Sequence, residues 1–126
     1  MVKVFVNDQY RVFEKDFGRR LTDQTFASGL NEFFVSCGLV TLNHLLDKLE
    51  DLLITLNSSP IQLIGASLLI AYEESHAANP KWNASLIDFA HSTIVDELQG
   101  PDAGVLLGLT NLYNSIKELV QARNPN

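Results

Sequence analysis

The residues best placed to do chemistry in this chain are an aspartate and a histidine that follow a short apolar stretch. Asp88 comes directly after Leu86 and Ile87, and His91 lies three residues further on. An apolar stretch that ends in an acid is typical of a buried strand that emerges into a cleft. In phosphoryl-transfer enzymes, an aspartate in such a place holds the metal ion that bridges the nucleotide phosphates. An aspartate that caps a turn after a strand would show the same local pattern.

Length and composition indicate one globular domain spanning residues 1–126. The chain is 46% hydrophobic and 19% charged, which is the balance of a folded protein rather than a disordered one. Its one cysteine, Cys37, cannot form an internal disulfide, and no signal peptide or membrane-spanning run is visible. We therefore expect an intracellular protein of the cytoplasm or nucleus. The net charge of −6 argues against direct nucleic-acid binding, which needs a basic surface.

The elements that must position Asp88 follow from hydrophobic periodicity, and together they predict an α+β fold. Alternation predicts a hairpin over residues 1–17, with a turn at Asn7 and Asp8. Thr22 is a good N-cap for a helix that we expect to end near residue 36. Apolar spacing predicts further helices over residues 41–56, which carry a wide leucine stripe, and over residues 105–122.

Two apolar runs predict the strands around Asp88. Residues 61–73 are read as one long strand buried on both faces, and residues 84–89 as a second buried strand that forms a hairpin with it. Residues 91–104 are expected to be irregular. If the two strands pair, the hydroxyl of Ser67 lies beside Asp88; a buried serine bonded to the backbone is an equally good account of Ser67.

Several motifs occur in a fixed order along the chain. Residues 16–22 read Asp-Phe-Gly-Arg-Arg-Leu-Thr, residues 66–73 contain Ser-Leu-Leu, residues 87–91 read Ile-Asp-Phe-Ala-His, and a glycine-rich turn covers residues 100–104. This order resembles the C-terminal half of the inositol polyphosphate kinase family. The family pairs an aromatic-Gly-Arg-x-Leu element with the same Ser-Leu-Leu and Ile-Asp-Phe-Ala-His strands. The resemblance covers nearly the whole chain.

The resemblance implies a function and a role for each site residue. It implies a lobe of a protein-kinase-like fold that transfers a phosphoryl group from ATP to an inositol polyphosphate, with Mg²⁺ held by Asp88. It implies that Ser67 lies near the metal or the nucleotide phosphates, and that His91 contacts the inositol phosphate; a structural histidine is the alternative for His91. Arg19 and Arg20 could bind phosphate or be structural. No residue is assigned a catalytic role.

The chain also departs from the family pattern. It lacks the defining Pro-x-x-x-Asp-x-Lys-x-Gly element, and only one serine precedes the Leu-Leu pair, where the family usually has two. We therefore expect residues 1–126 to be the C-terminal part of a kinase domain whose N-terminal lobe is absent, inactive alone. A non-catalytic kinase-like binding or scaffold module is the alternative. Because a partner lobe would be missing, we also expect self-association through the hairpin of residues 1–17.

Overall fold

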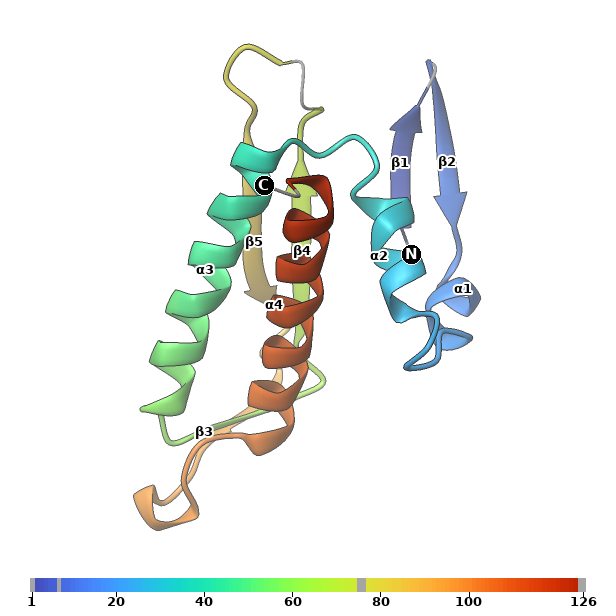
Figure 1. Cartoon of the computed structure of the whole chain (residues 1–126). Coiled ribbons are helices and arrows are strands. Elements are labelled where there is room, and N and C mark those ends of the chain that lie inside the picture. The colour runs from blue at the N-terminus through green and yellow to red at the C-terminus, as the bar shows by residue number, and fades with distance from the viewer. Residues whose placement is uncertain (1, 7, 75–76, 125–126) are drawn as a thin grey trace. The chain divides into compact units, whose positions relative to one another are not determined.

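The computed structural model describes residues 2–6, 8–74 and 77–124, which form two compact units, 1–37 and 38–126. Figure 1 shows their helices and strands. The first unit contains β1 (Val2–Val6), β2 (Gln9–Phe13), α1 (Lys15–Arg19) and α2 (Phe26–Phe33). The second contains α3 (Leu39–Asn57), β3 (Ile61–Ile64), β4 (Ser67–Tyr72), β5 (Trp82–Ile87), β6 (His91–Ile94), the short 3-10 helix η1 (Glu97–Gln99) and α4 (Ala103–Arg123). Each unit is described by itself.

The first unit is built on the expected hairpin. Strands β1 and β2 pair antiparallel, with Val4 opposite Arg11, and Asp8 takes a left-handed conformation (φ 61°) at the turn. Met1 and Asn7, which belong to the predicted hairpin, lie outside the described residues. The two faces of the hairpin differ: Val4 is buried, whereas Phe5 and Tyr10 are 42% and 67% exposed on the opposite face. Self-association of the chain through this exposed face of the hairpin therefore stays a prediction.

Two boundaries in the first unit were predicted wrongly. The second strand ends at Phe13 instead of reaching residue 17, because α1 begins at Lys15 and brings the rings of Phe13 and Phe17 to 4.6 Å. The following helix begins at Phe26, not after Thr22. The carbonyl of Thr22 accepts hydrogen bonds from the N–H groups of Thr25 and Phe26, which closes a turn there first. Local hydrogen bonds thus override the cap signal.

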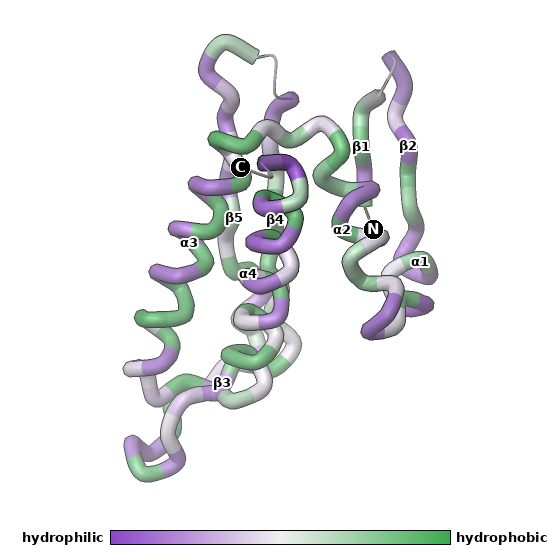
Figure 2. The backbone as a smooth tube through the Cα atoms, viewed as in Figure 1, coloured by the Kyte–Doolittle hydropathy of each residue, from purple (hydrophilic) through white to green (hydrophobic). Residues whose placement is uncertain are grey.

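The leucine stripe of α3 forms the core of the second unit, as predicted. Leu42, Leu45 and Leu49 are fully buried, and polar residues occupy the other side of the helix, as the alternating colours of α3 in Figure 2 show. Helix α4 runs antiparallel to α3 and packs against it (Figure 1), with Leu109 and Ile116 buried. The helix expected over residues 105–122 is therefore confirmed.

The predicted hairpin between the two apolar runs is also confirmed, but its shape differs. Strand β4 pairs antiparallel with β5, so that Ser67 lies opposite Ile87. The run at residues 61–73 is not one strand: it breaks after Ile64 into β3 and β4. It is not buried on both faces either, because exposed and half-buried residues alternate along β4. Residues 91–94, expected to be irregular, form β6 and pair with β3.

Helices and strands of the second unit form two layers. Figure 1 shows α3 and α4 covering one face of the β4–β5 pair. A cavity between the layers is lined by Leu68 of β4, Leu86 of β5 and Leu109 of α4, so these side chains point toward the helices. Ser67 and Leu69 alternate with Leu68 and are exposed on the other face. Among the described residues, no helix is long and apolar enough to cross a membrane.

Candidate active site

The candidate site lies where one long hairpin is interrupted. Strands β3 and β4 run along one side and β5 and β6 return along the other, with Ile64 opposite His91 and Ser67 opposite Ile87. Two residues, 65–66, therefore face three residues, 88–90, between the paired segments. One extra residue on one strand is the definition of a bulge, a feature that is common beside active sites because it redirects a side chain.

Both sides of this interruption contain left-handed backbone. Gly65 has φ 76° and Asp88 has φ 68°. Glycine adopts this conformation without penalty, but a residue with a Cβ does so at a cost, although aspartate tolerates it better than most. Such conformations cluster at functional sites, where the surrounding structure maintains them. The left-handed turn at Asp88 is therefore a specific feature of this hairpin and not a random irregularity of its backbone.

Asp88 directly follows the last residue of β5, and its side chain is exposed. Its carboxylate makes no hydrogen bond or ion pair with any residue in the ranges that the structure describes, and it caps no helix. The structure therefore does not support the alternative in which the Asp88 side chain caps a turn. A free carboxylate at a strand end is available to a ligand from outside.

Ser67 and His91 lie at the same interruption as Asp88. Ser67 begins β4 opposite Ile87, the residue before Asp88, and His91 begins β6 three residues after it. Both side chains are exposed, so Ser67 is not the buried serine that was the alternative. Neither side chain has a hydrogen-bond partner among residues 2–6, 8–74 and 77–124. The fold therefore places the three residues that the sequence singled out at one interruption of the hairpin; their roles stay predictions.

These residues fit a divalent metal that takes most of its ligands from elsewhere. No group of three or more histidine, cysteine, aspartate or glutamate side chains in the described part of the chain could hold a metal ion alone. Mg²⁺ in nucleotide sites is bound through one or two carboxylates together with phosphate oxygens and water. Asp88 offers one carboxylate ligand of that kind, and Ser67, at the same interruption of the hairpin, offers a hydroxyl oxygen.

A structural role that the sequence analysis missed belongs to Asp102, next to the candidate site in the fold of the second unit. Its carboxylate accepts hydrogen bonds from the N–H of Val105 (3.1 Å), which caps α4, and from the N–H of Leu63 in β3 (2.9 Å). The Leu63 bond, with help from those of Val105 and Gly104, lowers the pKa of Asp102 below its ordinary value of 3.8 despite a small opposing effect of burial. An aspartate directly before an apolar-periodic segment is a helix-start signal that could have identified it.

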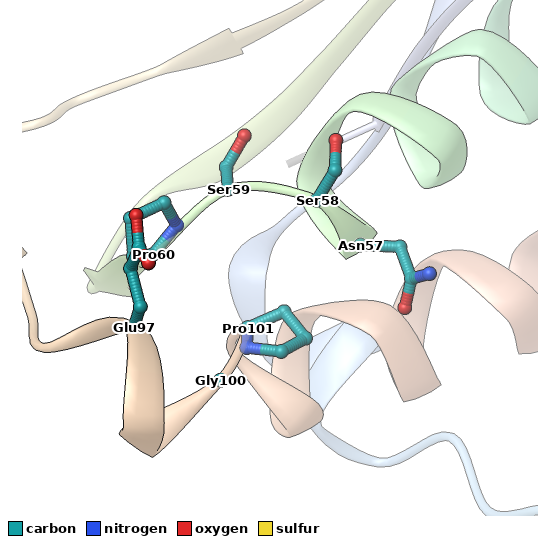
Figure 3. A pocket seen from close by; sticks show the side chains of 7 residues that line it. All are labelled: Asn57, Ser58, Ser59, Pro60, Glu97, Gly100 and Pro101. Carbon is teal, nitrogen blue, oxygen red and sulfur yellow. The ribbon is translucent and has the colours of Figure 1, made fainter.

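A second pocket lies between the end of α3 and the segment before α4, and Figure 3 shows its lining. Its volume is about 210 Å³, and its lining includes Asn57 at the end of α3 and Pro101 before α4. The Ser58 and Ser59 hydroxyls donate hydrogen bonds to carbonyl groups in the last turn of α3, so these protons are not available to a ligand in the pocket. Asn57 and Glu97 are the other polar residues of the lining, and we assign this pocket no ligand.

Comparison with known proteins agrees with the fold and the motifs. The model of the inositol polyphosphate kinase family matches residues 2–117. The inositol polyphosphate multikinase of Schizosaccharomyces pombe is 32% identical over 125 residues, which cover 91% of this chain and 46% of that protein. The crystal structure of the inositol phosphate multikinase Ipk2 from S. cerevisiae, in complex with ADP and Mn²⁺, superposes with a TM-score of 0.76 at 23% identity, covering 94% of this chain and 55% of that one.

The interrupted antiparallel hairpin and the two packed helices belong to a chain whose fold is like that of a solved kinase. The chain belongs to the inositol polyphosphate kinase family. The predicted α+β fold is confirmed by the likeness to a solved multikinase. The chain spans about half the length of the relatives that it matches.

Proposed function

We propose that this chain supplies one half of an ATP-dependent inositol polyphosphate kinase, in which Asp88 binds the divalent metal of the nucleotide. The observation that carries the proposal is the exposed, unpaired Asp88 carboxylate on a left-handed residue directly after β5, at the interruption of the hairpin where Ser67 and His91 also lie. Family membership supports the reaction, and the ADP and Mn²⁺ bound to the solved multikinase support a nucleotide with a divalent metal. In the cell we expect that metal to be Mg²⁺.

Each side chain has a role that suits its chemistry. Asp88 contributes a hard oxygen ligand, and the bound metal would supply charge neutralisation between the nucleotide phosphates. Ser67 donates a hydrogen bond from its hydroxyl group to a phosphate oxygen next to that site. His91 binds the inositol phosphate, either as a cation paired with a phosphate or as a neutral ring bonded to a hydroxyl group.

The 126 residues alone are expected to lack turnover. Phosphoryl transfer depends on positioning and electrostatic stabilisation, and it needs the metal, a phosphate-binding lysine and a group that orients the acceptor together. The printed sequence contains no Pro-x-x-x-Asp-x-Lys-x-Gly element, and its net charge of −6 does not suit a complete site for a polyanionic substrate. Metal-nucleotide binding without phosphoryl transfer is therefore the activity that the chain itself should show.

Paramagnetic broadening tests the metal site directly on this chain. Mn²⁺ and ADP added to the ¹⁵N-labelled protein should broaden the amide signals of residues 65–67 and 88–91 before any others. The Asp88→Asn variant should lose that broadening, because it removes the charge while keeping a side chain that tolerates left-handed backbone. Asp51→Asn, which alters an exposed carboxylate on α3, is the matched control and should leave the broadening intact. Broadening centred elsewhere, or unchanged in Asp88→Asn, would contradict the proposal.

A further inference from the structure

We propose that Thr22 is a modification site, phosphorylated by a protein kinase that recognises arginine side chains before its acceptor residue. Thr22 lies in the first unit, in the segment between α1 and α2, where the sequence reads Arg19-Arg20-Leu21-Thr22. Here the chain is the substrate of another kinase, and Thr22 is the acceptor of the phosphoryl group. The proposal therefore does not depend on the metal-binding role given above to Asp88 in the second unit.

Basic residues are concentrated before this one hydroxyl group. Arg19 and Arg20 are the only two neighbouring basic residues in a chain with 9 lysine and arginine residues and a net charge of −6. Thr22 is also the only serine or threonine with a lysine or arginine in the three positions before it. Protein kinases select their substrates by such charge patterns, because each arginine can pair with a carboxylate of the kinase. The sequence therefore singles out Thr22 for an arginine-directed kinase.

The structure presents the acceptor and both arginines to solvent. Arg19, Arg20 and Thr22 are all exposed, whereas Leu21 between them is half-buried. Leu21 packs against α2 so closely that a Cβ at Gly29 would lie 2.7 Å from the Leu21 Cδ1. The segment is therefore held to α2 by one apolar side chain, while the three residues that a kinase would contact stay accessible.

Weak contacts hold this segment, so a kinase can open it at little cost. The Thr22 hydroxyl lies 3.3 Å from the Thr25 hydroxyl, which is long for a hydrogen bond between two hydroxyl groups. Both arginines contact Asp16, through an ion pair at 3.7 Å from Arg19 and a hydrogen bond at 3.2 Å from Arg20 to the carbonyl, and these groups are exposed to competing water. Helix α1, which ends at Arg19, has 5 residues, and a helix of that length has little stability of its own.

The reaction uses ATP as its co-reactant. The Thr22 Oγ1 forms a bond to the γ-phosphorus of ATP, and the bond from that phosphorus to the β–γ bridging oxygen breaks, so that ADP leaves. The hydroxyl proton passes to a carboxylate of the modifying kinase. The product carries a charge of roughly −1.5 to −2 at neutral pH, and the guanidinium groups of Arg19 and Arg20 can pair with it in place of Asp16.

Incubation of the chain with ATP and the catalytic subunit of cyclic-AMP-dependent protein kinase tests the site. The intact mass should rise by one phosphoryl group, and fragmentation in the mass spectrometer should place that group on Thr22. Thr22→Ala should abolish the incorporation, whereas Thr22→Ser should retain it. Thr25→Ala removes the neighbouring hydroxyl group and is the matched control, which should still be modified. No incorporation into the wild type, or unchanged incorporation into Thr22→Ala, would overturn the proposal.

Further variants test whether the arginines direct the modification. Arg19→Ala and Arg20→Ala should each lower the kcat/KM of the protein kinase for this chain about tenfold or more, the loss expected for one hydrogen bond between charged groups. Lys15→Ala removes another exposed cation of α1 and is the matched control, which should leave kcat/KM unchanged. Asp23→Ala should raise kcat/KM, because it removes a negative charge beside the acceptor. Equal rates for the arginine variants and Lys15→Ala, or a lower rate for Asp23→Ala, would contradict recognition by charge.

Discussion

The carboxylate of Asp102 is hydrogen-bonded to the backbone N–H of Leu63, 39 residues earlier, at 2.9 Å. The same side chain caps α4 through Val105. One residue therefore joins the start of the last helix to β3, the strand that precedes Gly65. The position of α4 and the geometry of the candidate site depend on each other through this contact.

Removing the Asp102 side chain should destabilise the second unit. Asp102→Ala leaves the N–H groups of Leu63 and Val105 without their acceptor, and losing a helix cap costs about 1–2 kcal/mol. Urea unfolding followed by circular dichroism would measure the change. Asp51→Asn, on the exposed side of α3, should change the free energy of unfolding by less than about 0.5 kcal/mol. Equal effects of the two substitutions would mean that the contact contributes nothing.

The lowered pKa of Asp102 predicts how this contribution changes with pH. A carboxyl group whose pKa is lower in the folded state stabilises the fold fully above its ordinary value of 3.8. That stabilisation disappears as the pH falls through the lower folded value. The difference in unfolding free energy between the wild type and Asp102→Asn should therefore be largest near about pH 6 and shrink below about pH 4. A difference that grows on acidification would contradict this assignment.

Two glycines should respond to alanine in opposite directions. A Cβ at Gly65 would meet no atom within 4 Å, but its φ of 76° is unfavourable for alanine, so Gly65→Ala should lower stability by about 1 kcal/mol. A Cβ at Gly108, inside α4, would also meet nothing, and its backbone is helical. Gly108→Ala should raise stability by about 0.5–1 kcal/mol through helix propensity. Thermal unfolding of the two variants measures both signs.

The backbone at Asp88 predicts a conflict between stability and function. Glycine accepts a φ of 68° more readily than aspartate, so Asp88→Gly should stabilise the chain by about 0.5–1 kcal/mol while it abolishes metal-nucleotide binding. Asp96→Gly is the control, because Asp96 has φ −61° and its side chain caps η1. That change should not raise stability. If Asp88→Gly destabilised the chain as much as Asp96→Gly, the turn would not be strained.

Elements with strong hydrophobic periodicity could be predicted from the sequence. The leucines on one side of α3 and the apolar side of α4 are repeated at helical spacing, because these side chains pack into the core. This apolar spacing alone therefore identifies both helices. Ser67 and Asp88 were expected side by side because a hairpin is the simplest arrangement of two neighbouring apolar runs, and β4 and β5 do pair. Alternating burial along β4 could not be foreseen, because continuous apolar runs do not show which face a helix layer will cover.

Elements fixed by distant partners could not be predicted. Residues 91–94 are mostly polar, and they become a strand only because β3 lies opposite them. The break after Ile64 depends on the extra residue on the opposite side, which apolar periodicity does not reveal. The link between Asp102 and Leu63 spans 39 residues, so local patterns predict the helix cap but not the second hydrogen bond.

The most direct test of the central claim is phosphoryl transfer by a chimaera. In it, this chain replaces the matched 46% of the S. pombe multikinase, and ATP-dependent phosphorylation of inositol phosphates is measured. We predict activity in the chimaera, retained in Asp51→Asn and reduced roughly 10²-fold or more in Asp88→Asn, because the metal loses its carboxylate ligand. A folded chimaera without transfer, or equal activity in the two variants, would contradict the account.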